Sequence, residues 1–540
     1  MKYLDKTIEY GLYLLVFLLP VQTRWIIKAG ELHGGYWEYG TYSLYATDIL
    51  LFIVLSLFII GQITRSFCHL AEFLAIEAER LPRQQHLPPF NKQLHNSRIV
   101  WGFIGGLLLM SSISVFFAAS NLLALYKFGW LILGLGLFWL VTSANYDRLK
   151  LIYALSAGAL LSAGLAIWQF LTQSSFESKW LGLALHKASD LGSSVIEVVG
   201  PDGIGERWLR AYGGLDHPNI LGGVMAVGIL LILNLCLAGA PSEKSPARLA
   251  SLKLQRSERA TPLLKGLVVV FSAALFFSFS RSAWLGLAAA LALMTAQAVA
   301  GRNLKAQKSL AEIILIMGFL FFILFSQYEN LLAARVSGQG RLEGKSVAER
   351  IISYQDSWQL IKNNRLFGVG LGNYTLALNR VRPGEKSYFF QPVHNVFILA
   401  WSEIGIIGFL FFIALLFAIA RSLFRHPPTG GGGRATRQSD YLSSRRAERG
   451  EIYNSWLARL PSIIDFSPAA RNDGKGEVAH NDSAILITLV VIMCLDHWLW
   501  SLHFGVLFFW LMMGLMAGKK INPLHPRGYG RDKPPFKGEQ

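Results

Sequence analysis

One histidine stands where a long apolar run begins. The stretch QPVHNVFILAWSEIGIIGFLFF carries His394 at the mouth of the run and one carboxylate, Glu403, inside it. An imidazole has an unperturbed pKa of about 6.5 and can accept a proton at neutral pH, so His394 is a candidate general base. A structural alternative is also open. The flanking proline and asparagine suit a helix start, and Glu403 with Gly405 would kink or pack the helix.

Two further stretches combine arginine with a helix start. SFSRSAWLGL places Arg281 between two apolar runs, and ERWLRAYGGLDHPNILGG places Arg210 ahead of His217 and Asn219. A charge held at mid-membrane depth costs about 2.5–3.5 kcal/mol, so Arg281 either snorkels to the headgroups or faces a water-filled cavity that binds an anion. In the second stretch, Asp216 or Asn219 is also a candidate helix cap, with His217 a surface ring. Glu206 is a candidate partner that would make Arg210 structural.

Composition identifies the kind of protein. Of 540 residues, 53% are hydrophobic and only 16% are charged, whereas soluble proteins carry about 25% charge. Long apolar runs recur from end to end, which predicts an integral membrane protein. The three cysteines include no CxxC pair, which argues against a disulfide framework and a metal site. No metal and no cofactor are expected.

The apolar runs predict twelve membrane-spanning helices. The short gaps around Arg281 and Leu499 are each either a tight hairpin or a break within one helix. The predicted spans lie near 7–22, 46–63, 99–118, 124–144, 150–171, 219–238, 263–280, 282–300, 310–328, 394–420, 483–498 and 500–517.

The distribution of Lys and Arg predicts the orientation. Alternate connections are rich in both, so the positive-inside rule makes these connections and both termini cytoplasmic. This accounts for most of the net charge of +17 and leaves no reason to expect a nucleic-acid partner.

The cytoplasmic stretches 64–97, 240–261 and 425–480 are predicted to be flexible linkers. The predicted organisation is 1–171, spans one to five; 172–328, an external loop and spans six to nine; 329–393, a large external loop; 394–424, span ten; 425–482, a flexible cytoplasmic insert; 483–518, spans eleven and twelve; and 519–540, a cytoplasmic tail.

The large external loop has internal structure. Ile351, Tyr354, Trp358 and Ile361 recur at helical spacing, which predicts an amphipathic helix that lies on the membrane surface or caps a cavity. It should end at the two asparagines after Lys362. The following GVGLGNY lacks the Lys-Ser/Thr of a phosphate-binding loop and predicts a tight turn.

The topology brings the three candidate residues to one side. Arg210, Arg281 and His394 come from separate connections, all at the predicted external face. No ATP is available there, so a synthetic reaction needs a donor that is already activated, such as a glycan on a polyprenyl diphosphate. Arginines stabilise the leaving diphosphate, and a neutral imidazole accepts the proton of an acceptor hydroxyl. Five further residues are candidates for supporting roles: His217, Asn219, Arg350, Glu403 and Asp496.

These motifs resemble a known family. RAYGGLDHPNILGG, SFSRSAWLGL, ERIISYQDSWQLIKNNRLFGVGLGNY, HNVFILAWSEIGIIG and DHWLWSLHFG occur in the order seen in the O-antigen ligase and polymerase family, over roughly residues 200–515. The resemblance implies an all-α, twelve-span fold of the lipid-dependent (GT-C-like) glycosyltransferase kind. It also implies that His394 is catalytic and that Arg281 and Arg210 bind the diphosphate.

The resemblance further implies a metal-independent enzyme of the bacterial cytoplasmic membrane. Such an enzyme moves a glycan from undecaprenyl diphosphate to a glycolipid or glycan acceptor. The long insert 425–480 departs from the better-known ligases. A polysaccharide polymerase of the same family shares the motifs and stays open. A transporter or flippase is the alternative of a different class, but the clustering of unusual residues at one face favours an enzyme.

Overall fold

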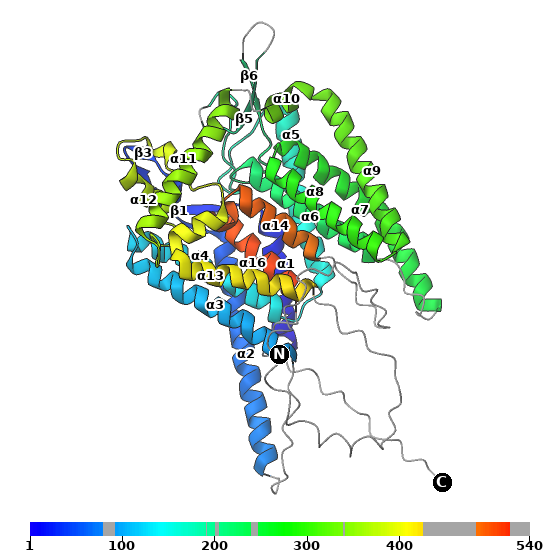
Figure 1. Cartoon of the computed structure of the whole chain (residues 1–540). Coiled ribbons are helices and arrows are strands. Elements are labelled where there is room, and N and C mark those ends of the chain that lie inside the picture. The colour runs from blue at the N-terminus through cyan, green and yellow to red at the C-terminus, as the bar shows by residue number, and fades with distance from the viewer. Residues whose placement is uncertain are drawn as a thin grey trace, which may run out of the picture.

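The computed structural model describes most of the chain as helix (Figure 1). Within the described residues, eight helices are long and apolar enough to cross a membrane, and three shorter apolar helices accompany them. The prediction of a helical membrane protein is confirmed, whereas the count of twelve spans stays a prediction. The described residues are 1–78, 92–190, 192–199, 205–238, 247–337, 341–424 and 482–518.

Most predicted spans coincide with one helix each. The N-terminal helices are α1 (Lys2–Leu18), α2 (Ala46–Ala78), α3 (Lys92–Phe116), α4 (Asn121–Ser143) and α5 (Arg148–Thr172). They are followed by α6 (Pro218–Ala238), α7 (Ala247–Ser278), α8 (Arg281–Ala300), α9 (Leu304–Gln327), α10 (Glu329–Ser337), α11 (Arg341–Asn363) and α12 (Tyr374–Val381). The last are α13 (Val396–Phe424), α14 (Asp482–Leu495), α15 (Trp498–Ser501) and α16 (His503–Ala517).

Two of the expected linkers are partly helical. The α2 helix continues to Ala78, and α7 begins at Ala247, so the linker assignment is wrong for those parts of 64–97 and 240–261. The apolar pattern reports only the lipid-facing part of a helix, and charged residues beyond it still form helix readily. The expected insert 425–482 lies outside the described residues up to 481, and the tail 519–540 lies outside them entirely.

The connections on one side of the bundle contain short antiparallel strand pairs. β1 (Arg24–Lys28) pairs with β4 (Tyr42–Tyr45), and β2 (Glu31–Leu32) pairs with β3 (Gly35–Tyr36). In the loop before α6, β5 (Val195–Val199) pairs with β6 (Gly205–Leu209). The β5–β6 hairpin projects from one end of the molecule beside α10, and α2 extends beyond the opposite end (Figure 1).

The chain reverses between α7 and α8. Phe279 has a left-handed φ of 46°, and the Ser280 hydroxyl caps α8 by accepting a hydrogen bond from the Ala283 amide. Both helices pack against α6, α7 in the antiparallel and α8 in the parallel direction, as the contacts of Gly228 with Phe271 and of Gly222 with Ala283 indicate. The gap around Arg281 is therefore a hairpin.

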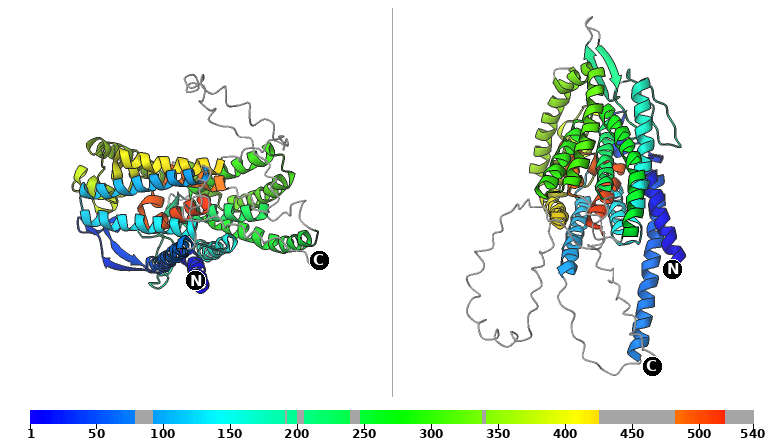
Figure 2. Two further views of the ribbon diagram at one scale, coloured as in Figure 1. Left: turned by 90° about the horizontal axis from the view of Figure 1, so that it is seen from below. Right: turned by 90° about the vertical axis from the view of Figure 1, so that its right-hand side faces the viewer.

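The second ambiguous gap is a break with a helical turn inside it. The α14 helix ends at Leu495, the single turn α15 follows, and α16 starts at His503. Between α14 and α15, residues 496 and 497 leave the helix and bury their side chains. The α16 helix then packs along α4, while α14 packs along α8. Figure 2 shows α13 running beside α3 at the edge of this bundle.

The glycine-rich loop between α11 and α12, residues 364–373 (the glycine loop), supports the α13 helix at a kink. Gly405, inside α13, has φ 68° and ψ 177°, and a Cβ there would lie 2.1 Å from the Leu366 carbonyl oxygen. The helix hydrogen bonds lost at the kink are replaced by the loop, whose amides at Val369 and Gly370 donate to the carbonyls of residues 402 and 403 at 2.9 and 3.0 Å. Gly368, Gly370 and Gly372 all have positive φ, so GVGLGNY forms a tight turn as predicted.

The predicted helix in the large loop is present. The α11 helix ends at Asn363, as expected. Ile351 and Trp358 are exposed, whereas Ile361 is buried. The Trp358 ring meets Trp401 of α13 edge to face at 6.2 Å, which fixes α11 against the end of the bundle.

Candidate active site

An uninterrupted set of hydrogen bonds joins three of the predicted residues. Arg210, which follows β6, donates from Nη2 to the Asn219 Oδ1 at 2.7 Å, and the Asn219 Nδ2 donates to the Asp496 Oδ2 at 2.7 Å. All three come from different segments: the β-hairpin, the first turn of α6 and the break after α14. Asp496 is buried, and its other oxygen accepts the His497 amide at 2.8 Å.

Arg210 also fixes the turn between α7 and α8. It is 4% exposed, and its Nε donates to the Ser278 carbonyl at 2.9 Å while Nη2 lies 3.4 Å from the Phe279 carbonyl. Glu206 instead accepts a hydrogen bond from the Trp208 indole. Arg210 therefore positions the turn from which Arg281 projects, and its predicted contact with the diphosphate stays a prediction.

His217 caps α6 and belongs to the same network. Its Nδ1 accepts the Asn219 amide at 3.1 Å, so the neutral ring carries its proton on Nε2, which lies 3.3 Å from the Ser194 hydroxyl. Arg210 donates to that same hydroxyl at 2.9 Å. The cap is thus His217, and the Asn219 side chain is used to connect Arg210 with Asp496. Burial, and secondarily Arg210, lower the pKa of His217.

His394 is half-buried at the N-terminal end of α13. Asn395, not His394, caps this helix: its Oδ1 accepts the amides of Phe397 and Ile398 at 2.9 and 3.0 Å. Across the described part of the chain, neither ring nitrogen of His394 has a hydrogen-bond partner. Its ring meets the His497 ring edge to face, with centroids 5.1 Å apart. The imidazole therefore has nitrogens available for a substrate.

Ser501 fixes the orientation of the His497 ring. Its Nδ1 lies 2.6 Å from the Ser501 Oγ, and that hydroxyl donates its own proton to the His497 carbonyl at 3.1 Å. When the hydroxyl donates to the carbonyl, Nδ1 is the donor to Ser501 and Nε2 is unprotonated in the neutral ring. Burial and the neighbouring His394 lower the pKa of His497 to about 3, against the opposing effect of Asp496.

Electrostatics favour a neutral base beside a charged carboxylate. Burial lowers the pKa of His394 and Arg350 lowers it further, which outweighs the opposite effects of Asp496 and Glu349. Burial alone would raise the pKa of Asp496, but the adjacent imidazoles and the Asn219 amide hold it below its usual value. At neutral pH, His394 is unprotonated and Asp496 is ionised.

Two guanidinium groups meet at the α7–α8 turn. The Arg281 Nη1 donates to the Arg335 carbonyl at 3.3 Å, and the Arg335 Nε donates to the Phe279 carbonyl at 3.3 Å. Both side chains are partly exposed. Arg335 belongs to α10, so the first helix of the large loop adds a cation that the sequence motifs did not single out.

Arg350 and Glu403 take up different positions. Arg350 lies within electrostatic range of His394, and in the described chain its buried Nε has no hydrogen-bond partner. Glu403 is buried inside α13 and accepts the Trp500 indole N–H at 2.8 Å. The backbone amides of Gly372 and Tyr374 also face its carboxylate. Glu403 therefore fixes the glycine loop and α15 to α13, while Arg350 is available to an anion.

A comparison with known families covers part of the site. Residues 266–413 match the family described as O-Antigen ligase. This part of the chain is similar to the O-antigen ligase family. The matched region includes Arg281, Arg350, His394 and Glu403, whereas Arg210 and the Asp496 break lie outside it. No curated protein matches the chain. Together with the apolar helices, the similarity to this family supports a multi-pass bacterial membrane protein with a glycosyltransferase-like role.

One residue of the site escaped sequence reasoning. Arg335 stands among several other arginines of the large loop, and no local pattern separates it from them. His497 is different, because the pair of Asp496 and His497 in DHWLW is recognisable in the sequence as a candidate for supporting a site or for capping a helix.

Proposed function

We propose that this protein transfers a glycan from undecaprenyl diphosphate to an acceptor hydroxyl at the external face of the bacterial cytoplasmic membrane. His394 acts as the general base, and arginines hold the diphosphate. The observation that carries the proposal is the ring of His394, which has open nitrogens and a depressed pKa, lies beside Asp496 and falls within the stretch similar to the O-antigen ligase family.

The proposed chemistry needs one proton transfer. The acceptor oxygen forms a bond to the anomeric carbon of the donor, the bond from that carbon to the diphosphate oxygen breaks, and His394 takes the hydroxyl proton. Asp496 then faces an imidazolium and stabilises it, which makes Asp496 a positioning residue. The departing diphosphate gains negative charge, which Arg281, Arg335 and Arg350 are placed to stabilise.

Arg210, Asn219 and His217 form the support of this site. Arg210 fixes the turn before Arg281, and the Asn219 side chain joins Arg210 to Asp496 by hydrogen bonds to both. His217 caps α6 and sets the start of that helix. We assign to Glu403 the support of the glycine loop. In this proposal, the connections before α6, before α8 and before α13 must pack together before transfer can occur.

The decisive test uses the purified full chain in lipid nanodiscs. Given undecaprenyl-diphosphate glycan and an extract of envelope glycolipids, the wild type should release undecaprenyl diphosphate and glycosylate an acceptor. His394→Ala should lose about 10²–10⁴-fold in turnover per folded molecule while binding undecaprenyl diphosphate as the wild type does. Asn395→Ala is the matched control, because it removes the helix cap next to the base and should lower stability more than turnover per folded molecule.

Two results would contradict the assignment. If His394→Ala keeps wild-type turnover per folded molecule, another group is the base, and His497 is the next candidate. If the wild type moves intact lipid-linked glycan across a bilayer without releasing undecaprenyl diphosphate, the protein is a flippase. Products with repeated additions to a lipid-linked acceptor would identify a polymerase of the same family.

A further inference from the structure

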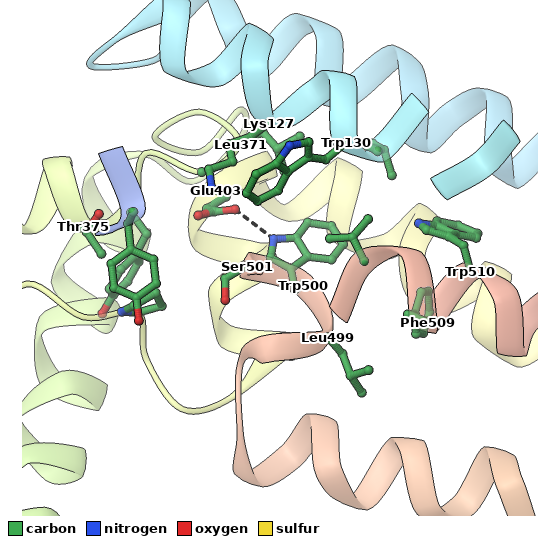
Figure 3. Close-up of a pocket in the computed structure, with 16 residues that line it drawn as sticks. Lys127, Trp130, Leu371, Thr375, Glu403, Leu499, Trp500, Ser501, Phe509 and Trp510 are labelled. Carbon is green, nitrogen blue, oxygen red and sulfur yellow. Dashed lines mark hydrogen bonds between the residues drawn. The ribbon is translucent and has the colours of Figure 1, made fainter. Parts of the chain in front are cut away.

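A separate cavity lies beside the His394–His497 pair. It is enclosed by α4, the glycine loop, α12, α13, α15 and α16, and its lining includes Lys127, Trp130, Thr375, Glu403, Trp500 and Ser501 (Figure 3). Lys127 stands in the second turn of α4, and Glu403 stands in the second turn of α13. The cavity is therefore at the same end of the bundle as the candidate active site.

Two buried polar groups of this cavity lack an acceptor in the described chain. Lys127 is 8% exposed, and no carboxylate of the described chain pairs with its ammonium, which lies 3.6 Å from the centre of the Trp130 ring. Among the same residues, the Thr375 Oγ1 has no hydrogen-bond partner, whereas the Trp130 indole faces the Tyr126 hydroxyl. Buried polar groups are nearly always satisfied, so a buried ammonium and a buried hydroxyl at one cavity indicate a ligand that supplies acceptors.

The lining restricts the chemistry of that ligand. A hydrocarbon chain offers no acceptor for the Lys127 ammonium or the Thr375 hydroxyl. A diphosphate would face the Glu403 carboxylate, and the arginines near the α7–α8 turn are better placed to hold it. The hydroxyl and ring oxygens of a sugar accept hydrogen bonds without adding charge. The aromatic lining, which includes Trp500, suits the apolar face of a pyranose ring.

The cavity is connected to the proposed base. Pro392, two residues before His394, lines it, and so does Ser501, whose hydroxyl oxygen lies 2.6 Å from the His497 Nδ1. The arginines project from α8, α10 and α11, none of which lines the cavity. Asp496 and His497 lie between α14 and α15. On one side of them, α14 packs against α8, which carries Arg281; on the other side, α16 packs against α4, which carries Lys127. The cavity and the arginines thus flank the imidazole pair.

We infer that this cavity binds a sugar residue of the acceptor, with Lys127 and Thr375 as the groups that recognise it. The inference rests on the proposed function, because it assigns the acceptor to one side of His394 and the donor diphosphate to the other. A sugar held by Lys127 would present a neighbouring hydroxyl toward Pro392 and the His394 ring.

The test separates acceptor recognition from donor recognition. Lys127→Met and Thr375→Val each remove one donor and keep an apolar side chain of similar size. With an envelope glycolipid extract as acceptor, each should raise the acceptor KM by about tenfold or more, as expected for a lost hydrogen bond. The Kd of undecaprenyl diphosphate should stay unchanged. Thr142→Val is the matched control, because it alters a Thr of α4 that does not line the cavity.

A binding measurement keeps the inference independent of turnover. Deacylated, water-soluble glycan prepared from the same extract should raise the unfolding temperature of the wild type and of Thr142→Val but not of Lys127→Met. An equal shift in Lys127→Met, an unchanged acceptor KM, or an equal weakening of undecaprenyl diphosphate binding would overturn the sugar site. A wild type that binds the glycan but never releases undecaprenyl diphosphate would overturn the transferase proposal and leave the sugar site standing.

Discussion

Asn219→Asp alters one pair of atoms in a network of defined geometry. The substitution keeps an oxygen for Arg210 but replaces the amide that donates to Asp496 with a second carboxylate oxygen. Two unit charges at the observed 2.7 Å repel by about 6 kcal/mol at an effective dielectric constant of about 20. The two carboxyls should therefore retain a proton between them.

Retaining that proton has a predictable dependence on pH. An ordinary Asp carboxyl has a pKa of about 3.9, so holding a proton at pH 7 costs about 4 kcal/mol. The repulsion raises the pKa of Asp496 in the folded variant above its unfolded value. The folded variant then binds more protons than its unfolded chain, so its stability falls as pH rises above about 4, by about 1.4 kcal/mol per pH unit. In the wild type, the pKa of Asp496 is lowered, so the contribution of this carboxyl to stability is lost as pH falls rather than as it rises.

The measurement is thermal or denaturant unfolding of wild type and variant in one detergent. Between about pH 5 and about pH 7 the destabilisation by Asn219→Asp should grow by about 3 kcal/mol. Asn219→Leu is the control, since it removes both hydrogen bonds without adding a charge and should show a shallower dependence on pH. A difference that stays constant, that shrinks as pH rises, or that Asn219→Leu reproduces would refute the repulsion and the Asn219–Asp496 contact with it.

Three further predictions concern the cations and the orientation. Arg281→Lys should lose most of the transfer activity at normal expression, because a compact ammonium cannot grip two phosphate oxygens as the planar guanidinium does; near-normal turnover would indicate snorkelling. Arg350→Gln should shift the acid limb of the pH–rate profile to higher pH, since it removes a cation that lowers the pKa of the base, whereas Asp496→Asn should shift it to lower pH; shifts in the same direction would contradict the electrostatic account. In intact cells, Lys345→Cys should react with an impermeant thiol reagent and Lys305→Cys should not, and the reverse pattern would invert the topology.

Sequence reasoning located the helices because lipid imposes a strong requirement. A spanning helix needs a run of about 20 apolar residues, and the described helices begin and end within a few residues of most runs. It failed at the edges, as at Ala78 and Ala247, where charged residues continue a helix past the apolar part. It also failed for the β5–β6 hairpin, because a pairing of VIEVV with GERWL depends on contacts between two strands that neither strand encodes alone.

For the candidate site, sequence motifs supplied residue types but not their contacts. The role of Arg210 illustrates the difference. Its sequence context suggested a phosphate ligand, whereas its contacts show a side chain bound to the Ser278 carbonyl and to Asn219. The contact between His394 and His497 joins residues about a hundred positions apart, and local spacing carries no information about such a pair. Tertiary packing, rather than any motif, determines which nitrogen of each ring is available.

The kink at Gly405 has a consequence for the order in which the protein is assembled. The carbonyls of residues 402 and 403 obtain their hydrogen-bond donors from Val369 and Gly370, and the Ile406 amide donates to the Arg365 carbonyl. Unpaired backbone groups in lipid cost several kcal/mol each, so α13 cannot enter the bilayer in its kinked form until these partners are present. The partners precede α13 in the chain and are synthesised first. Transplanting α13 without residues 365–370 should therefore yield a straight helix that has lost its kink, and with it the place of Glu403 beside Trp500.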